Sequence, residues 1–228
     1  RKNSISSQVQ EWKLQRWREF NENESYSLVV ENKEYMQDIV ENLMRQVKGE
    51  NGDFILSENK EMNISKNIYF IVEPFTIEFN DRKIMSKLYE KLLLITNDYP
   101  EAYNIINTDI VQALEKVTTD SEYSNIEYNL EFDWKGLFKL YNIRMGEDYN
   151  SLFEKIQEYI KILVDIMSIK VIVFLNLKEY LSNEQMDAIQ SMCQYKKIIL
   201  FMLESQERES LSNEKIFIVD KDRCLIVK

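Results

Sequence analysis

The sequence predicts an α/β protein whose parallel sheet is covered on both faces. Two short, continuous apolar runs indicate it, Lys170–Asn176 (KVIVFLN) and Lys197–Glu204 (KIILFMLE). Runs of this kind are typical of strands that are buried on both sides. A helical pattern over Ser182–Tyr195 lies between them, so the region reads β-α-β. Ser182 and Gln185 have the spacing of a capping box, which predicts where this helix begins.

A further strand is predicted at Ser25–Glu31, and it runs directly into an amphipathic helical pattern at Asn32–Val47. The turn between them reads ENK. Nucleotide-binding α/β folds carry a glycine-rich loop at such a turn, where backbone amides hold phosphate. This chain has only 4 glycines in 228 residues, and none lies there. The pattern therefore indicates a nucleotide-binding scaffold that lacks the nucleotide-binding parts, and it favours binding over catalysis.

The remaining elements predict a discontinuous domain with a helical insertion. Strands are expected at 54–57 and 68–72, two short strands within 1–20, and a closing hairpin over 216–219 and 224–227. Helical periodicity extends over 81–95, from Pro100 onward, and over 150–168. Since Pro74 marks the change of pattern, we expect an α/β head of residues 1–73 with 169–228, and a mainly helical leg of residues 74–168.

Composition excludes several kinds of chemistry. The chain contains no histidine, which removes Ser-His-Asp and Cys-His catalysis and most zinc or iron sites. Cys193 and Cys224 are isolated, so they predict core residues in a reducing cytoplasm rather than a disulfide or zinc framework. No apolar run is long enough to span a membrane. A net charge of −10 requires any basic surface for nucleic acid to be segregated from the acids.

One acidic stretch stands out, residues 117–134 (VTTDSEYSNIEYNLEFDW), in which five acids occur with no basic residue. Its second half alternates apolar and polar residues, which predicts a strand over 126–134. One interpretation is a solvated strand face, with Asp133 as the N-cap of a helix at Trp134–Tyr141. A site for Ca²⁺ or Mg²⁺ is a second, because these cations prefer oxygen ligands. A metal-dependent nuclease centre is a third.

Several segments together resemble the CRISPR-associated type II-A adaptation proteins of the Csn family. They are NLEFDWKGLFKLYNIRM, FEKIQEYIKILVDI, KVIVFLNLKEYLSNEQMDAIQ, and IILFMLESQERES followed by KIFIVDKDRCLIV, in that order. The resemblance extends over roughly residues 25–228. It implies that each subunit has an α/β head similar to a P-loop ATPase core, but without a functional Walker motif, and a helical leg. It also implies a ring-shaped homotetramer that threads onto the ends of linear double-stranded DNA without sequence preference. It also implies spacer acquisition beside integrase and nuclease proteins, and no enzymatic activity, nucleotide or membrane.

The same resemblance implies structural Ca²⁺ bound by acidic residues. The acidic stretch lies where the family carries these acids, so the expected ligands are Glu127, Glu131 and Asp133, with Asn129 as an amide-oxygen ligand. Asn129 stands where the family often has an acid.

A ring around a duplex needs lysine and arginine on its inner wall, where they reach phosphates without reading bases. Each candidate is equally compatible with an ordinary solvated surface residue. The candidates are Lys135, Lys139, Arg144, Lys155, Lys161, Lys196 and Lys197. Trp12, Trp17 and Trp134 are expected to anchor a core or an interface rather than to stack on bases.

Three other functions remain open from sequence. The first is a metal-dependent nuclease using Glu127, Glu131 and Asp133, which cleavage of linear DNA with Mg²⁺ or Mn²⁺ would reveal. A surviving nucleotide switch would bind an ATP analogue. An adaptor that contacts only protein would bind no duplex.

Overall fold

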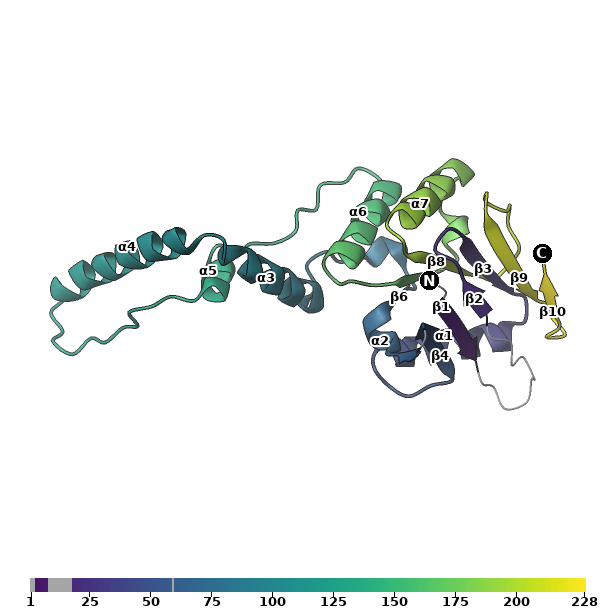
Figure 1. Ribbon diagram of the computed structural model, residues 1–228, viewed down its shortest axis with the longest axis horizontal. Helices are drawn as coiled ribbons and strands as arrows, with labels where there is room; N and C mark the ends of the chain where they lie inside the picture. The colour runs from purple at the N-terminus through teal and green to yellow at the C-terminus, as the bar shows by residue number, and fades with distance from the viewer. Residues whose placement is uncertain (1–2, 8–17, 59) are drawn as a thin grey trace. The chain divides into compact units, whose positions relative to one another are not determined.

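A computed structural model describes residues 3–7, 18–58 and 60–228, which divide into two compact units (Figure 1). The sheet unit comprises residues 1–77 and 148–228, and the helical unit comprises residues 78–147. The chain enters the helical unit after residue 77 and returns to the sheet unit at residue 148, so the helical unit is an insertion in the sheet unit. The fold is mixed α/β, as the sequence predicts.

The sheet unit is built on a six-stranded sheet of order β10-β9-β3-β8-β7-β6. All neighbouring strands are parallel except β10, which pairs antiparallel with β9 and closes the sheet with the expected hairpin. Central strands β7 and β8 are almost entirely buried, as their continuous apolar runs predict. The strands are β3 (Ser25–Val30), β6 (Ile68–Ile71), β7 (Val171–Leu175), β8 (Ile199–Glu204), β9 (Glu214–Val219) and β10 (Leu225–Val227).

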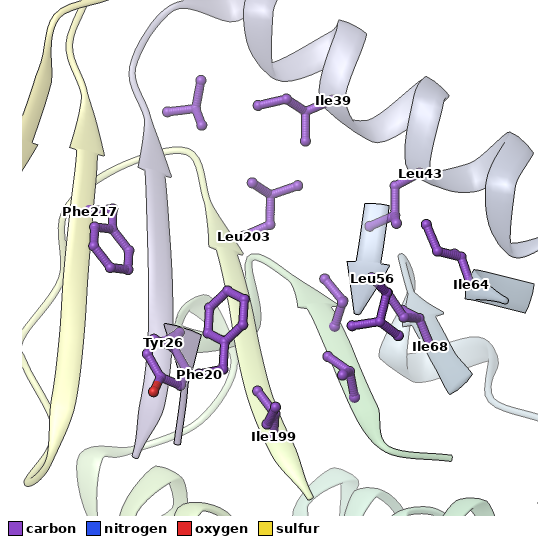
Figure 2. Packing of buried hydrophobic residues seen from close by; sticks show 13 residues of the cluster. Phe20, Tyr26, Ile39, Leu43, Leu56, Ile64, Ile68, Ile199, Leu203 and Phe217 are labelled. Carbon is purple, nitrogen blue, oxygen red and sulfur yellow. The ribbon is translucent and has the colours of Figure 1, made fainter. Parts of the chain in front are cut away.

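Helices cover both faces of this sheet. α1 (Lys33–Val47) packs Ile39 and Leu43 into a cluster that includes Tyr26 of β3 and Leu203 of β8 (Figure 2). α7 (Asn183–Tyr195) lies over the opposite face, because its Gln190 amide donates to the hydroxyl of Ser25, the neighbour of Tyr26. The capping box of Ser182 and Gln185 is formed as predicted.

A second, four-stranded antiparallel sheet of order β2-β1-β4-β5 packs beside α1. Phe20 and Leu56 from this small sheet join the same core cluster, and the Phe20 ring meets Tyr26 edge-on with centroids 4.5 Å apart (Figure 2). The sequence predicts two strands within residues 1–20 and one at 54–57, but neither the strand at 60–62 nor that these strands form a sheet of their own. They are β1 (Asn3–Ser7), β2 (Arg18–Phe20), β4 (Phe54–Glu58) and β5 (Lys60–Met62); two short helices follow, α2 (Ile64–Asn67) and η1 (Pro74–Thr76).

The helical unit contains α3 (Arg82–Thr96), α4 (Pro100–Thr119) and α5 (Trp134–Leu140). Asp81 caps α3 by accepting hydrogen bonds from the amides of Lys83 and Ile84, and Pro100 occupies the first turn of α4. Few large side chains are fully buried among the described residues of this unit, namely Phe79, Ile84 and Phe138. The unit therefore has only a small core of its own.

Two features differ from the sequence prediction. α6 (Leu152–Asp165), which we expected in the leg of residues 74–168, lies in the sheet unit. Its Ile156, Ile160 and Leu163 are completely buried, and the Tyr159 hydroxyl lies 2.7 Å from that of Tyr69 on β6. Helical periodicity identifies the buried stripe of α6 but not the surface that the stripe covers.

The predicted strand over residues 126–134 is wrong. This segment is irregular, with bends at Leu130 and Glu131, up to Asp133, which caps α5. An alternating pattern produces a strand only when a neighbouring strand supplies backbone hydrogen bonds, and here a side chain supplies them instead.

Candidate nucleic-acid interface and acidic segment

The acidic segment is held onto α4 by one asparagine. The Asn107 amide nitrogen donates to the Leu130 carbonyl at 2.9 Å, and its amide oxygen accepts from the Phe132 amide at 3.2 Å. A single side chain therefore substitutes for two hydrogen bonds of a neighbouring strand. The segment is held at these two points, although it belongs to no sheet and bends at Leu130 and Glu131.

Aromatic packing against the same helix also fixes this segment. The Phe132 ring stacks on Tyr103 of α4 with centroids 4.7 Å apart, and Trp134 meets Phe132 edge-on at 5.2 Å. Trp134 also contacts Phe138, which contacts Tyr89 of α3. The half-buried Trp134 thus has the structural role expected from the sequence. Trp12 and Trp17 lie outside the described residues.

The expected cation ligands project from this segment in alternation with the packed rings. Glu127, Asn129, Glu131 and Asp133 are all exposed. Of the residues between them, Tyr128 and Phe132 are half-buried, whereas Leu130 is exposed. Asp133 also caps α5, because its Oδ1 accepts from the Gly136 amide at 2.8 Å. The N-cap interpretation of Asp133 is therefore confirmed.

These oxygens do not converge within one chain. Across residues 3–7, 18–58 and 60–228, no three His, Cys, Asp or Glu side chains are grouped so that they could hold a metal ion. Exposed carboxylates have the right chemistry for Ca²⁺, but a complete coordination shell of six to eight oxygens would need ligands from elsewhere.

The seven predicted phosphate-contacting residues fall into two sets. Lys135 and Lys139 lie four residues apart on α5, Arg144 follows it, and all three are exposed in the helical unit. The other four, Lys155, Lys161, Lys196 and Lys197, belong to the sheet unit.

The candidates also differ in whether they already form an ion pair or a hydrogen bond within the chain. Lys161 pairs with Glu158 at 2.5 Å, Lys196 pairs with Asp165 at 2.9 Å, and Lys155 donates to the Phe75 carbonyl at 2.8 Å. Within the described part of the chain, Lys135, Lys139, Arg144 and Lys197 make no such contact. The group around α5 is therefore the most available for an external phosphate.

Sequence reasoning missed a row of lysines on α3. Lys83, Lys87 and Lys91 recur every four residues and are exposed, so they follow one face of the helix. α3 packs against α5, since the Tyr89 hydroxyl donates to the Ile143 carbonyl at 2.9 Å and its ring lies 5.7 Å from Phe138. The lysine spacing itself is the signal that could have identified this row.

Electrostatics confirm that the α3 and α5 lysines are close. The pKa of Glu90 on α3 is lowered, first by its hydrogen bond from Lys87 and further by the charge of Lys135 on α5. We call the lysine row of α3, with the cations of α5 and the turn after it, the basic surface; its residues are Lys83, Lys87, Lys91, Lys135, Lys139 and Arg144. Of these, Lys87 pairs with Glu90 at 2.7 Å.

The turn that would hold phosphate in a nucleotide-binding protein is closed by a side chain. After β3, Asn32 caps α1 by accepting from the Tyr35 amide at 3.0 Å, and its own amide nitrogen donates to the Lys221 carbonyl at 3.0 Å. The strand passes into the helix with no glycine, as the sequence predicts.

The structure defines the class as a mixed α/β protein with a mainly parallel sheet and an inserted helical unit. A sequence model of the family described as CRISPR-associated protein (Cas_Csn2) matches residues 46–223. The match extends from α1 to the last hairpin and includes the whole helical unit. The chain therefore belongs to this family of CRISPR-associated adaptation proteins. None of its described helices is long and apolar enough to cross a membrane.

Proposed function

We propose that this protein serves CRISPR adaptation as a non-enzymatic, ring-forming homotetramer that encloses the ends of double-stranded DNA. The observation that carries the proposal is the basic surface of α3 and α5 in a chain of this family. Lysines and arginines that approach phosphates bind duplex DNA without reading its sequence, which suits a protein that handles fragments of any sequence. Integrase and nuclease proteins of the adaptation machinery are the expected partners.

Exposed apolar side chains of the helical unit support self-assembly. Leu94, Ile95, Tyr99 and Ile105 follow one another around the α3–α4 junction and are 52–68% exposed. Apolar side chains gathered in this way mark interaction sites in soluble proteins. A second copy that covers them would give the helical unit the larger core that it lacks alone.

Calcium is proposed as a structural ion that is bound on assembly. Glu127, Asn129, Glu131 and Asp133 offer exposed oxygen ligands, but the described residues of a single chain hold no converged set. We propose that ligands from neighbouring subunits complete the coordination, so the cation joins subunits and offsets the repulsion between their acids. We propose that the protein acts without ATP, which the glycine-free turn after β3, where Asn32 caps α1, supports.

Two measurements test this function together. Light scattering in Ca²⁺ should give the mass of a tetramer, and a chelator should reduce that mass. Gel shifts should show binding to linear duplex and much weaker binding to a covalently closed circle of the same sequence. A monomer in Ca²⁺, or equal affinity for both DNA forms, would contradict the proposal. Cleavage of the linear DNA in Mg²⁺ or Mn²⁺ would instead support the nuclease alternative.

A further inference from the structure

A buried carboxyl group lies at the carboxyl end of central strand β8. Glu204, the last residue of this strand, is 2% exposed. Its Oε1 accepts a hydrogen bond from the Lys178 backbone amide at 3.2 Å, and in the sheet register it stands opposite the apolar Val29 of β3. Burial of a carboxylate is costly unless a cation or several donors compensate for it.

Lys178 compensates for this carboxyl only in part. The Lys178 ammonium lies 2.7 Å from Oε1 of Glu214 and also donates to the Glu209 carbonyl at 3.0 Å. Its side chain is therefore committed elsewhere in the core, and only its backbone amide reaches Glu204. The other charged groups that act on the Glu204 carboxyl are Glu179, from the same short helix η2 (Leu177–Glu179), and Arg208.

Arg208, whose charge acts on this carboxyl, has a donor without a hydrogen-bond partner. Its guanidinium pairs with Glu179 through one terminal nitrogen. Among buried side-chain nitrogen and oxygen atoms of the described residues, the Arg208 Nε is the one without a hydrogen-bond partner. A buried N–H without a partner costs free energy, so this guanidinium gains from any additional acceptor within its reach.

The loop that carries Arg208 begins directly after Glu204. Residues 205–213 connect β8 to β9, and the loop is tied to the carboxyl ends of the neighbouring strands. The Ser205 amide donates to the Asn176 side chain at 2.8 Å, and the Gln206 amide nitrogen donates to Glu179 at 2.9 Å. Glu179 thus holds two residues of the loop, and Glu204 lies at its base.

We propose that Glu204 and Arg208 form a proton-controlled switch for the loop 205–213. When Glu204 is protonated, Arg208 stays with Glu179 and the loop keeps the arrangement described above. When Glu204 loses its proton, the buried anion attracts the guanidinium, and Arg208 uses its free Nε–H to pair with it. The bonds of Glu179 to Arg208 and Gln206 then loosen, and the loop rearranges.

The switch operates near neutral pH. Burial raises the pKa of Glu204 to about 7, while Lys178 and Arg208 oppose this shift only in part. Small changes of pH around neutrality therefore change the charge at this position. In parallel α/β sheets the loops at the carboxyl ends of the strands are the ones that contact ligands and partners. The switch would thus act on a loop of the sheet unit, whereas the basic surface belongs to the helical unit.

Nuclear magnetic resonance of the whole chain labelled with ¹⁵N-arginine tests the switch. We expect the Arg208 Nε–H signal to shift downfield with a midpoint near pH 7, because the Nε–H then gains the Glu204 carboxylate as a hydrogen-bond partner. Backbone amide signals of residues 205–213 should move with the same midpoint. In Glu204→Gln, which keeps an acceptor for Lys178 but cannot ionise, both shifts should disappear.

Two controls keep the outcomes distinct. Glu179→Gln removes the other partner of Arg208 and a negative charge that raises the pKa of Glu204, so the transition should persist with a lower midpoint. Loss of the transition in Glu179→Gln, or its survival in Glu204→Gln, would overturn the proposal. The carboxyl ¹³C shift of Glu204 in the unmodified protein requires no variant, and a midpoint below about pH 5 there would equally reject the switch.

Discussion

Lys178 and Glu214 form a buried ion pair, with the ammonium 2.7 Å from the carboxylate and side-chain exposures of 6% and 0%. Glu214 also accepts from the Leu211 amide at 2.7 Å and from the Ser27 hydroxyl. The pair therefore joins η2, β3 and β9 on one side of the sheet. Its polar groups are satisfied, so it fixes the arrangement of these elements rather than adding a large net stability.

Removal of one member of this pair should be strongly destabilising. Lys178→Met leaves the Glu214 carboxylate buried without its cation, and we expect a loss of about 3–5 kcal/mol in the free energy of unfolding. Urea denaturation followed by circular dichroism measures it. The double variant Lys178→Met with Glu214→Leu should recover much of the loss, because no unpaired charge then remains. A double variant less stable than the single one would contradict this account.

Charge reversal on α5 tests the basic surface. Lys135→Glu with Lys139→Glu should weaken binding to linear duplex and reduce the slope of log affinity against log salt by about 2, roughly one for each phosphate that is no longer neutralised. Gel shifts over a salt series measure both. Lys161→Glu with Lys196→Glu changes the charge equally at residues that already pair with Glu158 and Asp165. An equal effect of the two variants would contradict the assignment to α5.

Asn107 should control the acidic segment. Asn107→Ala removes both hydrogen bonds to residues 130 and 132, at a cost of about 1–3 kcal/mol for the unpaired backbone groups. The segment should lose its fixed conformation and, with it, affinity for Ca²⁺. Isothermal titration with Ca²⁺ measures this loss. Asn104→Ala, on an exposed position one turn earlier in α4, is the matched control and should bind as the unmodified protein does.

The exposed apolar junction should be needed for assembly. Leu94→Asp with Ile105→Asp places two charges on side chains that are 68% and 62% exposed. Such changes scarcely affect the isolated chain but are costly in an interface that excludes water. Light scattering in Ca²⁺ should therefore show a lower mass with unchanged helix content. Tyr195→Asp, at an 86% exposed residue of the sheet unit, should leave the mass unchanged. A full-size assembly of the double variant would exclude this surface as the interface.

Stability should depend on pH through Glu204. Because burial raises its pKa from 4.5 to about 7, the folded state holds this proton more tightly than the unfolded state does. The resulting stability is present below about pH 4.5, and it is lost as pH rises through 7, by about 3 kcal/mol in total. Urea denaturation between these limits should show a decline in the unmodified protein relative to Glu204→Gln. Parallel curves would mean that Glu204 titrates normally.

Much of the sheet unit follows from the sequence because its signals are local. The runs over 170–176 and 197–204 predict β7 and β8, since a strand buried on both faces needs apolar residues at every position. The capping box at Ser182 and the glycine-free turn at Asn32 are likewise visible in a few adjacent residues. The family resemblance read from the segment order is confirmed by the match over residues 46–223.

Only the tertiary structure decided how these pieces meet. Periodicity revealed the apolar stripe of α6 but not that the stripe lies in the sheet unit, and alternation over 126–134 predicted a strand that has no neighbouring strand. Lys178 and Glu214 are 36 residues apart in the sequence. Asn107 of α4 is likewise distant in sequence from the segment at 130–132 to which it hydrogen-bonds. A local pattern indicates which side chains avoid water and which residues favour a helix. Contacts between residues that are distant in the sequence depend on how whole elements pack, and a short stretch of sequence does not determine that packing.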